Sequence, residues 1–420
     1  MKHERHKLVV IGGGFGGLQV VHGLKGAGLD ITLVDQRNHH LFQPFLYQVA
    51  TSILPTSEIA WPIRHIFARR RDVTTLMGEV TGIDRAARQV GLRDGKRLPY
   101  DTLVIATGAR HSYFGNDGWE KAAPGLKTLE DATTIRRRML LAFERAESAT
   151  SKAEAQAHLT FAIIGAGPTG VELAGIIAEL AQTTLRREFR NIDTATAKVL
   201  LIEAGPRVLS AFPDSLSEYA ATALEKLGVT VLCGTPVTQC TPEAITLGDQ
   251  VIPCKTAVWA AGVAASPAAG WLGAEADRVG RVKVEADLTL EHAPEIFVVG
   301  DTAAVVAEDG TPVPNVAPAA KQMGKFVGKV IRARRKGKPA PRAFKYRHAG
   351  NLATIGKRAA VVHMGRLKLK GALAWWFWGL AHIYFLIGTR SRIAVAWSWL
   401  WSYMTGHNNA RLITQSRPDE

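Results

Sequence analysis

Short apolar runs in this chain alternate with glycine-rich turns and amphipathic stretches, a pattern that predicts an α/β fold. The first run, Leu8–Ile11, is followed by glycines and then by a helical pattern over residues 16–25. A second run, residues 31–35, ends in an aspartate. This order of strand, turn, helix and strand is typical of a dinucleotide-binding unit built on a parallel sheet.

The same order occurs a second time along the chain. The sequence LVVIGGGFGG near the start returns as FAIIGAGPTG, so that Gly12 and Gly165 are equivalent first glycines. The second copy runs from His158 through a longer helix to a strand at residues 198–203. We therefore expect two dinucleotide-binding units.

Between the copies, residues 130–147 have helical spacing, and residues 148–156 are polar enough to form a crossing between domains. Later, a strand-like stretch at residues 296–299 leads into Gly300-Asp301. We interpret this stretch as a return to the first domain, with the second domain inserted into it.

Gly12-x-Gly14-x-x-Gly17 is the fingerprint of a loop that binds a pyrophosphate. The first glycine makes the tight turn, the second lets backbone N–H groups reach the phosphates, and the third lets helix and strand pack closely. The helix N-terminus adds partial positive charge. Asp35 follows where an acid can accept hydrogen bonds from both ribose hydroxyls. The alternative is a turn with only a structural role, and the complete order of elements argues against it.

Gly165-x-Gly167-x-x-Gly170 repeats this logic, with Glu203 as the acid at a longer separation. A carboxylate there would repel the 2′-phosphate of NADPH and so favours NADH, although Arg207 lies close enough in sequence to weaken that argument. Two loops imply two dinucleotides, and the simplest pair is one resident flavin and one exchangeable nicotinamide. A hydride can pass from nicotinamide C4 to flavin N5 while the protein supplies position and electrostatics.

Segments spread over nearly the whole chain resemble the two-dinucleotide flavoproteins and, more closely, the type II NADH dehydrogenases. The segments are LVVIGGGFGGL, NHHLFQPFLYQVAT, YDTLVIATGA, GAGPTGVELAG, VLLIEAGPRVL, VWAAGV, IFVVGDTA and VAPAAKQMG. The resemblance implies a single-chain NADH:quinone oxidoreductase of a respiratory chain. Such an enzyme passes a hydride from NADH to FAD, and then two electrons to a membrane quinone, without pumping protons.

The resemblance also assigns cofactor-binding residues by position, and it gives Asp301 the ribityl chain of the flavin. The residues implied for FAD are Gly12, Gly14, Phe15, Gly16, Gly17, Asp35, Gln36, Val80, Ala106, Thr107, Gly108, Asp301 and Lys321. The residues implied for NADH are Gly165, Gly167, Pro168, Thr169, Gly170, Glu203, Ala261 and Gly262.

Two further residues are implied in catalysis. Glu172 resembles the family's carboxylate near the nicotinamide and the flavin, and the alternative is an acid that only complements the helix dipole. The segment APAAKQ, which begins at Ala317, resembles the family's AxxAxQ quinone motif, with Pro318 where many members carry Gln. The resemblance thus implies that Gln322 contacts a quinone carbonyl, while Ala317 and Ala320 leave room for a flat ring.

The formal charge of +15 favours anionic partners such as dinucleotide phosphates, acidic lipids or nucleic acid. No nucleic-acid module with interleaved aromatic residues is visible, so we expect no nucleic-acid partner. The densest basic run, residues 332–342, contains glycine and proline and predicts an exposed loop.

Cys233, Cys240 and Cys254 form no CxxC pair, so we expect neither a metal site nor a disulfide framework, and a reducing compartment fits. Their positions also disfavour two related classes. Sulfide:quinone oxidoreductases use cysteines on the flavin side of the fold, and disulfide reductases need a redox pair after the first helix, where NHHLFQPFLYQ has none. An NADH oxidase and a redox-gated binding flavoprotein remain as alternatives.

The C-terminal segment has a composition of its own. Residues 371–388 carry no formal charge and reach the threshold length of a spanning helix. Six of the ten tryptophans of the chain lie in this segment: Trp375, Trp376, Trp378, Trp397, Trp399 and Trp401. Because tryptophan favours the membrane interface, we expect helices that lie in one leaflet. A spanning helix and an ordinary dimer or core helix are the alternatives.

These inferences combine into an α/β fold with two Rossmann-like domains and a membrane-associating tail. We expect an FAD domain at residues 1–125 and 258–360, an NADH domain at 126–257 and a membrane-anchoring segment at 361–420. The charged N-terminus runs straight into a strand and lacks the apolar core of a secretory signal. We therefore expect a peripheral, monotopic enzyme on the cytoplasmic face of the cell inner membrane, and the resemblance implies a homodimer.

Overall fold

The computed structural model describes residues 5–405 and 410–413, so that the first four residues and parts of the predicted membrane segment lie outside the described residues. The chain forms two compact units, each built from three stretches. Unit 1 comprises Met1–Leu41, Trp61–Arg110 and Val263–Ala349, and unit 2 comprises Phe42–Ala60, His111–Gly262 and Gly350–Glu420.

The core of unit 1 is a six-stranded sheet in the order β20-β21-β9-β1-β2-β5. Its strands are β1 (Lys7–Ile11), β2 (Asp30–Asp35), β5 (Val73–Met77), β9 (Thr102–Ile105), β20 (Thr289–Leu290) and β21 (Ala293–Val298). All neighbours run parallel except β20 and β21. The central strands β1 and β9 are almost wholly buried, which suits their continuous apolar sequences.

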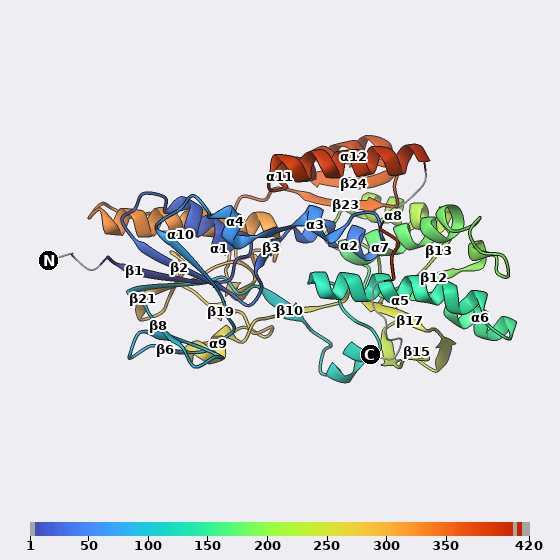
Figure 1. Cartoon of the computed structure of the whole chain (residues 1–420), viewed down its shortest axis with the longest axis horizontal. Coiled ribbons are helices and arrows are strands. Elements are labelled where there is room, and N and C mark those ends of the chain that lie inside the picture. The colour runs from blue at the N-terminus through green and yellow to red at the C-terminus, as the bar shows by residue number, and fades with distance from the viewer. Residues whose placement is uncertain (1–4, 406–409, 414–420) are drawn as a thin grey trace. The chain divides into compact units, whose positions relative to one another are not determined.

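Helices α1 (Phe15–Gly23) and α10 (Ala317–Arg335) lie side by side over one face of this sheet (Figure 1). Glycines allow the two backbones to come close. A Cβ atom at Gly324 of α10 would lie 2.3 Å from the carbonyl oxygen of Gly16, so no larger residue fits without moving a helix.

Unit 1 also contains small sheets and short helices. They are α4 (Ile63–Ile66), β6 (Val80–Asp84), β7 (Gln89–Leu92), β8 (Arg97–Pro99), α9 (Ala268–Leu272), β19 (Val282–Lys283), η5 (Gly300–Thr302) and β22 (Ala303–Ala304). Four short strands stand where the chain changes unit: β3 (His39–Leu41), β4 (Ala60–Pro62), β10 (Ala109–His111) and β18 (Val263–Ala265).

Unit 2 contains a four-stranded parallel sheet in the order β13-β12-β11-β17. Its strands are β11 (Thr160–Ile164), β12 (Lys198–Glu203), β13 (Val229–Cys233) and β17 (Thr256–Trp259). An antiparallel sheet, β14 (Val237–Cys240), β15 (Ala244–Leu247) and β16 (Gln250–Pro253), follows β13 in sequence. The helices of this part are η2 (Asp117–Lys121), α5 (Leu129–Glu147), α6 (Lys152–His158), α7 (Pro168–Glu179), η3 (Leu180–Thr184), η4 (Thr194–Thr196) and α8 (Asp214–Lys226).

The rest of unit 2 surrounds a second antiparallel sheet, formed by β23 (Asn351–Ile355), β24 (Ala359–Met364) and β25 (Leu367–Lys370). Two helices then end the described chain, α11 (Gly371–Phe385) and α12 (Thr389–Thr405). An earlier stretch supplies η1 (Gln43–Phe45), α2 (Leu46–Ala50) and α3 (Thr56–Ile59), and Figure 1 labels α2 next to α7. Contacts of α2 with α7 and of α11 with β24 join these parts.

One sequence-based expectation was wrong, and another was wrong in part. Residues 148–156, predicted as a polar crossing between domains, lie within unit 2 and largely form α6, because Ser151 caps that helix by accepting from the N–H of Glu154. The basic run at residues 332–342 was predicted as an exposed loop. This prediction fails for Arg332–Arg335, which form the last turn of α10, and holds for residues 336–342, which follow the helix without regular structure. In that last turn the guanidinium of Arg332 donates to the carbonyl oxygens of Gly23 and Lys25 at the end of α1.

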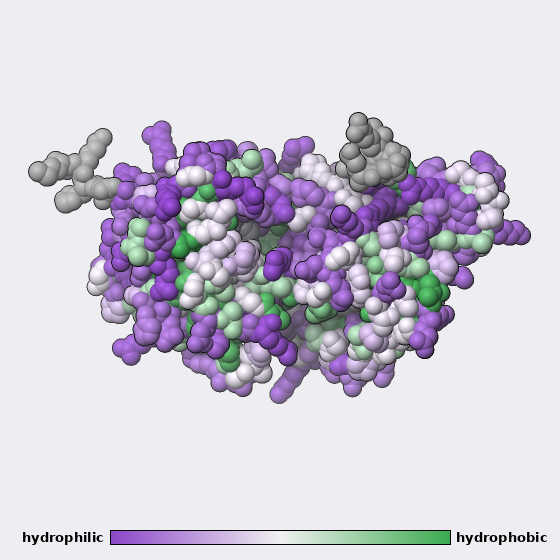
Figure 2. Space-filling view, turned by 90° about the horizontal axis from the view of Figure 1, so that it is seen from below, coloured by the Kyte–Doolittle hydropathy of each residue, from purple (hydrophilic) through white to green (hydrophobic). Residues whose placement is uncertain are grey.

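One face of the molecule is shown in Figure 2, where hydrophilic residues predominate and hydrophobic residues are scattered. Large apolar side chains that are exposed, by contrast, are concentrated on the two C-terminal helices. Those exposed on α11 are Leu373, Trp376, Leu380, Tyr384 and Phe385, and those on α12 are Ile393, Trp397, Leu400, Trp401, Tyr403 and Met404. Within residues 5–405 and 410–413, no helix combines the length and the hydropathy needed to cross a membrane.

Candidate dinucleotide sites

The first glycine-rich loop connects β1 to α1 in unit 1, and its geometry admits only glycine at two positions. Gly12 has a φ of +104°, and a Cβ atom on it would lie 2.3 Å from the carbonyl oxygen of Ala106. A Cβ atom at Gly17 would lie 1.9 Å from the carbonyl oxygen of Gly12. Gly14 is the N-cap of α1 and makes no side-chain capping hydrogen bond, so no side chain of the cap residue occupies the N-terminus of this helix.

Asp35 closes this loop from the end of β2. Its carboxylate accepts from the backbone N–H of Gly13 at 2.6 Å and of Arg37 at 2.7 Å. Burial raises the pKa of the Asp35 carboxyl, and these two N–H donors offset part of that rise. Asp35 therefore fixes the loop while keeping lone pairs for a ribose.

The predicted second and third flavin segments meet next to this loop. The hydroxyl of Thr107 lies 2.6 Å from that of Ser266 and 3.2 Å from that of Thr302. Thr302 also donates to the carbonyl oxygen of Gly108 at 3.1 Å. Because Thr302 follows Asp301 in η5, this hydroxyl cluster ties the predicted ribityl-binding turn to the end of β9. Neither Ser266 nor Thr302 was predicted as a site residue from the sequence.

The start of α10 also borders the loop. The ammonium of Lys321 lies 4.9 Å from the ring centre of Phe15, and burial lowers its pKa. Ala320 is buried, and its Cβ atom lies 3.4 Å from the position that a Cβ atom would take at Gly300. Of the other residues implied for FAD, Val80 is buried at the start of β6 and Gln36 is exposed.

Gln322, the predicted quinone ligand, is hydrogen-bonded within unit 1. Its amide nitrogen donates to the carbonyl oxygen of Arg347 at 2.8 Å, and its amide oxygen accepts from the N–H of Arg347 at 3.0 Å. The amide therefore holds the segment before Ala349, and its nitrogen carries a second hydrogen that can donate to another group. Ala317 is partly exposed in the first turn of α10.

The second glycine-rich loop repeats the geometry of the first in unit 2. Gly165 also has a φ of +104°, and a Cβ atom at Gly170 would lie 1.8 Å from the carbonyl oxygen of Gly165. The N-cap of α7 is Gly167, again without a capping side chain, and Pro168 occupies the first turn next to Thr169. The two loops, which share their glycine spacing, thus also share a backbone shape.

Glu203 takes the place of Asp35 in this loop. Its two carboxylate oxygens accept from the N–H of Ala166 at 2.7 Å and of Gly205 at 2.8 Å. Arg207 was a possible ligand for a 2′-phosphate, but its guanidinium donates to the carbonyl oxygen of Phe212 and pairs with Asp214 at 2.7 Å. These contacts commit Arg207 to its own loop.

The predicted Ala261-Gly262 pair follows β17 at the same end of the sheet. The backbone of Ala261 lies 2.6 Å from the position that a Cβ atom would take at Gly165. At Gly262 a Cβ atom would lie 2.5 Å from the ring of Phe114. The indole N–H of Trp259 holds this region by donating to the carbonyl oxygen of Ser112 at 2.8 Å.

Glu172 lies on α7 and is buried in unit 2 with few polar neighbours. The backbone N–H of Thr354 in β23 donates to its carboxylate at 3.4 Å. Burial raises the pKa of Glu172 to about 8. The carboxyl is therefore mostly protonated at neutral pH.

A chain of hydrogen bonds leads from the Thr354 side chain to the C-terminal helices. The hydroxyls of Thr354 and Tyr47 lie 3.0 Å apart, and Gln48 donates to the Tyr47 hydroxyl at 3.0 Å. The indole N–H of Trp399 on α12 donates to the amide oxygen of Gln48 at 2.7 Å. Burial, with the nearby Glu172 as a smaller cause, raises the pKa of the Tyr47 hydroxyl. Tyr47 and Gln48 were not predicted as site residues, although both lie in the segment NHHLFQPFLYQ that resembles the family.

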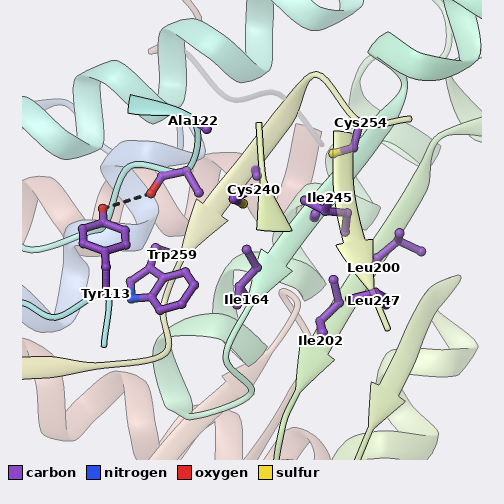
Figure 3. Close-up of a cluster of buried hydrophobic side chains, with 13 residues drawn as sticks. Tyr113, Ala122, Ile164, Leu200, Ile202, Cys240, Ile245, Leu247, Cys254 and Trp259 are labelled. Carbon is purple, nitrogen blue, oxygen red and sulfur yellow. Dashed lines mark hydrogen bonds between the residues drawn. The ribbon is translucent and has the colours of Figure 1, made fainter. Parts of the chain in front are cut away.

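The three cysteines are free thiols in unit 2. Cys240 and Cys254 belong to a buried hydrophobic cluster with Ile164, Ile245 and Trp259 (Figure 3). Burial raises the pKa of both thiols to about 11, which keeps them protonated and unreactive. Among the described residues, no group of three or more His, Cys, Asp or Glu side chains could hold a metal ion.

Comparisons with known proteins agree with this architecture. Residues 6–324 match the pyridine nucleotide-disulphide oxidoreductase family, and residues 348–408 match the NDH2 C-terminal domain. The chain is 44% identical over 416 residues to the type II NADH:quinone oxidoreductase NdhA of Mycobacterium tuberculosis, covering 95% of this chain and 87% of NdhA. The chain belongs to the type II NADH:quinone oxidoreductases. The resemblance found in the sequence is thereby confirmed.

Other members of this family are also similar to the chain. The type II NADH:quinone oxidoreductase Ndh of the same organism is 42% identical, covering 99% of this chain and 91% of Ndh. Among solved structures, NDH2 from Plasmodium falciparum in complex with NADH has a TM-score of 0.88 at 20% identity, over 98% of this chain and 100% of that one. The sulfide:quinone oxidoreductase of Aquifex aeolicus has a TM-score of 0.73 at 20% identity, over 98% and 93%. These likenesses confirm the α/β fold.

Proposed function

We propose that the chain oxidises NADH with a resident FAD and passes two electrons to a membrane quinone, without pumping protons. The observation that carries this proposal is the repeated loop: two glycine-rich turns of equal geometry, each with a glycine N-cap and an acid at the end of the next strand. The family to which the chain belongs supports the same reaction.

The residues of the first loop fit FAD. A glycine backbone there leaves the space that a pyrophosphate needs, since a Cβ atom at Gly14 would meet no atom within 4 Å. The Nε2 atom of His40, which contacts this loop, is buried and has no hydrogen-bond partner among the described residues, as is expected where a ligand supplies the partner. The FAD residues in this proposal are those implied by the sequence, from Gly12 to Lys321. When bound, the flavin supplies the redox chemistry, and the chain holds and orients it.

The second loop fits NADH, held by the predicted residues from Gly165 to Gly262. The carboxylate of Glu203 would accept hydrogen bonds from the adenosine ribose and repel a 2′-phosphate. Because the guanidinium of Arg207 is engaged with Phe212 and Asp214, it offers little compensation for that repulsion. NADH is therefore the preferred donor over NADPH in this proposal.

Glu172 and Gln322 are the proposed catalytic residues. Glu172 would sit beside the nicotinamide and, with its raised pKa, can change protonation near neutral pH. The remaining amide hydrogen of Gln322 would donate to a quinone carbonyl, and Ala317 and Ala320 would let the ring approach. No side-chain base is needed for hydride transfer itself.

The C-terminal helices would attach the enzyme to one membrane leaflet. Trp397 and Leu380 are exposed, as are most other large apolar side chains of α11 and α12. We place the enzyme on the cytoplasmic face of the cell inner membrane as a homodimer, with no nucleic-acid partner. The proposed domains remain 1–125 with 258–360 for FAD, 126–257 for NADH and 361–420 for the membrane.

Anaerobic stopped-flow mixing tests this function. NADH should bleach the visible absorbance of the bound flavin, and a quinone added in detergent should restore it. An enzyme that NADPH alone reduces would reject the assignment of Glu203. One that oxygen reoxidises as fast as quinone does would instead be an NADH oxidase.

A further inference from the structure

The side chain of His40 is a buried imidazole that contacts the first glycine-rich loop. One of its ring nitrogens has a hydrogen-bond partner among the described residues, and the other has none. Its Nδ1 donates to the carbonyl oxygen of Gly13 at 2.9 Å, and its ring meets that of Phe15 edge to face at 5.1 Å. Only 3% of His40 is exposed, and no described residue offers its Nε2 a hydrogen bond.

The protonation state of this ring follows from its contacts. A carbonyl oxygen can only accept, so the proton is on Nδ1, and Nε2 of the neutral ring is an acceptor. Burial lowers the pKa of His40 to about 4, which keeps the ring neutral at physiological pH. Nε2 is thus a buried lone pair that needs a donor.

The second loop provides an internal reference for this contact. There the carbonyl oxygen of Ala166, which corresponds to that of Gly13, accepts from the backbone N–H of Leu209 at 2.8 Å. The fold can therefore satisfy this carbonyl without any side chain. The first loop instead uses an imidazole, which adds a second polar atom at a place where the second loop has none.

We propose that His40 Nε2 accepts a hydrogen bond from a hydroxyl group of the dinucleotide held by the first loop. This inference rests on the proposed FAD site. Phosphate oxygens would repel the lone pair, whereas the hydroxyls of the ribityl chain and of the adenosine ribose flank the pyrophosphate and are donors. Since Gly13 also bonds Asp35, His40 and the loop acid are joined through one residue.

Two substitutions separate the two nitrogens. In His40→Asn the amide can donate to Gly13 as Nδ1 does, but nothing takes the place of Nε2. In His40→Gln the amide reaches the place of Nε2, and the donor to Gly13 is lost. We expect the Asn variant to bind FAD about fivefold to tenfold more weakly than the Gln variant, which is the usual effect of one hydrogen bond. Equal affinities, or weaker binding by the Gln variant, would overturn the proposal.

The measurement is the dissociation constant of FAD for the full-length apoprotein, from quenching of flavin fluorescence. Far-UV circular dichroism checks folding, and NADH binding at the second loop is the matched reference. FMN and ADP then distinguish the two hydroxyl sources. Weaker binding of FAD and FMN by the Asn variant indicates that the ribityl chain supplies the hydroxyl. Weaker binding of FAD and ADP indicates that the adenosine ribose supplies it. Unchanged affinity of the Asn variant for both FMN and ADP overturns the proposal.

A test on the native protein does not depend on the folding of either variant. In protein labelled with ¹⁵N-histidine, FAD should move the His40 Nε2 resonance upfield, as happens when this nitrogen accepts a hydrogen bond. An unmoved resonance in protein that has bound FAD refutes the role of His40 alone. Failure of the wild-type apoprotein to bind FAD refutes instead the function on which the inference rests.

Discussion

The two glycine-rich loops share a backbone but differ in their surroundings. Gly12 and Gly165 have the same φ. A Cβ atom on the third glycine of either loop would lie 1.9 Å or 1.8 Å from the carbonyl oxygen of the first glycine. Two residues after the third glycine, however, the first loop has Gln19 and the second has Glu172. The shared backbone suits any dinucleotide, so the differences must decide what each loop does with its ligand.

Different elements also cover the two helices. Gly324 of α10 packs against the backbone of Gly16, and this second helix closes over α1. In unit 2, β23 packs on α7, where a Cβ atom at Gly175 would lie 2.6 Å from the backbone nitrogen of Gly356. The first loop thus has a helical cover and the His40 imidazole beside it. The second has a β cover and the titratable carboxyl of Glu172.

The largest expected effects come from destroying the loops one at a time. Gly17→Ala would press a Cβ atom into the carbonyl oxygen of Gly12, at a cost of at least about 3 kcal/mol, and should yield protein without flavin. Gly170→Ala should keep the flavin but prevent NADH from bleaching it. Flavin absorbance per chain and its loss with NADH are the two readouts. The control is Gly118→Ala, where a Cβ atom meets nothing within 4 Å. Flavin retention in Gly17→Ala would contradict the assignment.

Replacing the buried carboxyl should change the pH dependence of stability. The pKa of Glu172 is raised to about 8 in the folded chain, so its stabilising proton is retained well above its unfolded pKa and is lost as the pH rises through about 8. The free energy of unfolding of the wild type should therefore fall as the pH rises from about 4.5 to about 8, by about 1.4 kcal/mol for each pH unit. Glu172→Gln should remove this slope.

The comparison is made by thermal unfolding at pH 6 and pH 9. The melting temperature of Glu172→Gln relative to the wild type should be higher at pH 9 than at pH 6. Glu218→Gln, at an exposed helical position, should show no such change. A difference between wild type and Glu172→Gln that is the same at both pH values would mean that the carboxyl is not buried.

Replacing the loop acid by its amide should affect NADH kinetics in the second loop and flavin retention in the first. Glu203→Gln removes a hydrogen-bond acceptor from the second loop and should raise the KM for NADH about tenfold. It should also reduce the preference of the enzyme for NADH over NADPH. Asp35→Asn should leave that preference unchanged and speed the loss of flavin instead. Steady-state kinetics with both nucleotides, and flavin release on dilution, distinguish the two. If both substitutions alter the same parameter, the loops do not hold different ligands.

The smallest expected effect concerns the outer end of the hydrogen-bond chain in unit 2. Trp399→Phe removes the donor to the buried amide oxygen of Gln48 and should cost about 1 to 3 kcal/mol of unfolding free energy. Trp397→Phe on the same helix changes an exposed indole and should cost much less. Chemical denaturation of both variants in the same detergent makes the comparison. Equal losses would show that the indole N–H of Trp399 contributes nothing.

Local patterns were enough to predict much of the fold. The glycine spacing and the apolar strands predicted both loops and their acids, because these features depend on neighbouring residues. The predicted helix at residues 130–147 is α5, and the strand after residue 296 is β21. The end of α10 was not predictable, since Arg332 donates to the carbonyl oxygens of Gly23 and Lys25, which lie 309 and 307 residues earlier in the chain.

The same limit applies to the sites. His40 bonds a loop that precedes it by 27 positions, and no spacing rule connects the two. Tyr47 and Gln48 became notable only when the fold brought them between Thr354 and Trp399. Local motifs therefore identified the loops and Glu172, whereas His40, Tyr47 and Gln48 come to these sites from other parts of the chain.

In this interpretation the first loop retains a flavin and the second exchanges a nicotinamide. Anaerobic titration of the purified enzyme with NADH measures both properties at once. We expect one FAD per chain, bleached completely by one equivalent of NADH and restored by quinone. A colourless folded protein that cannot be reconstituted with flavin, or a chain that retains two flavins, would contradict this interpretation.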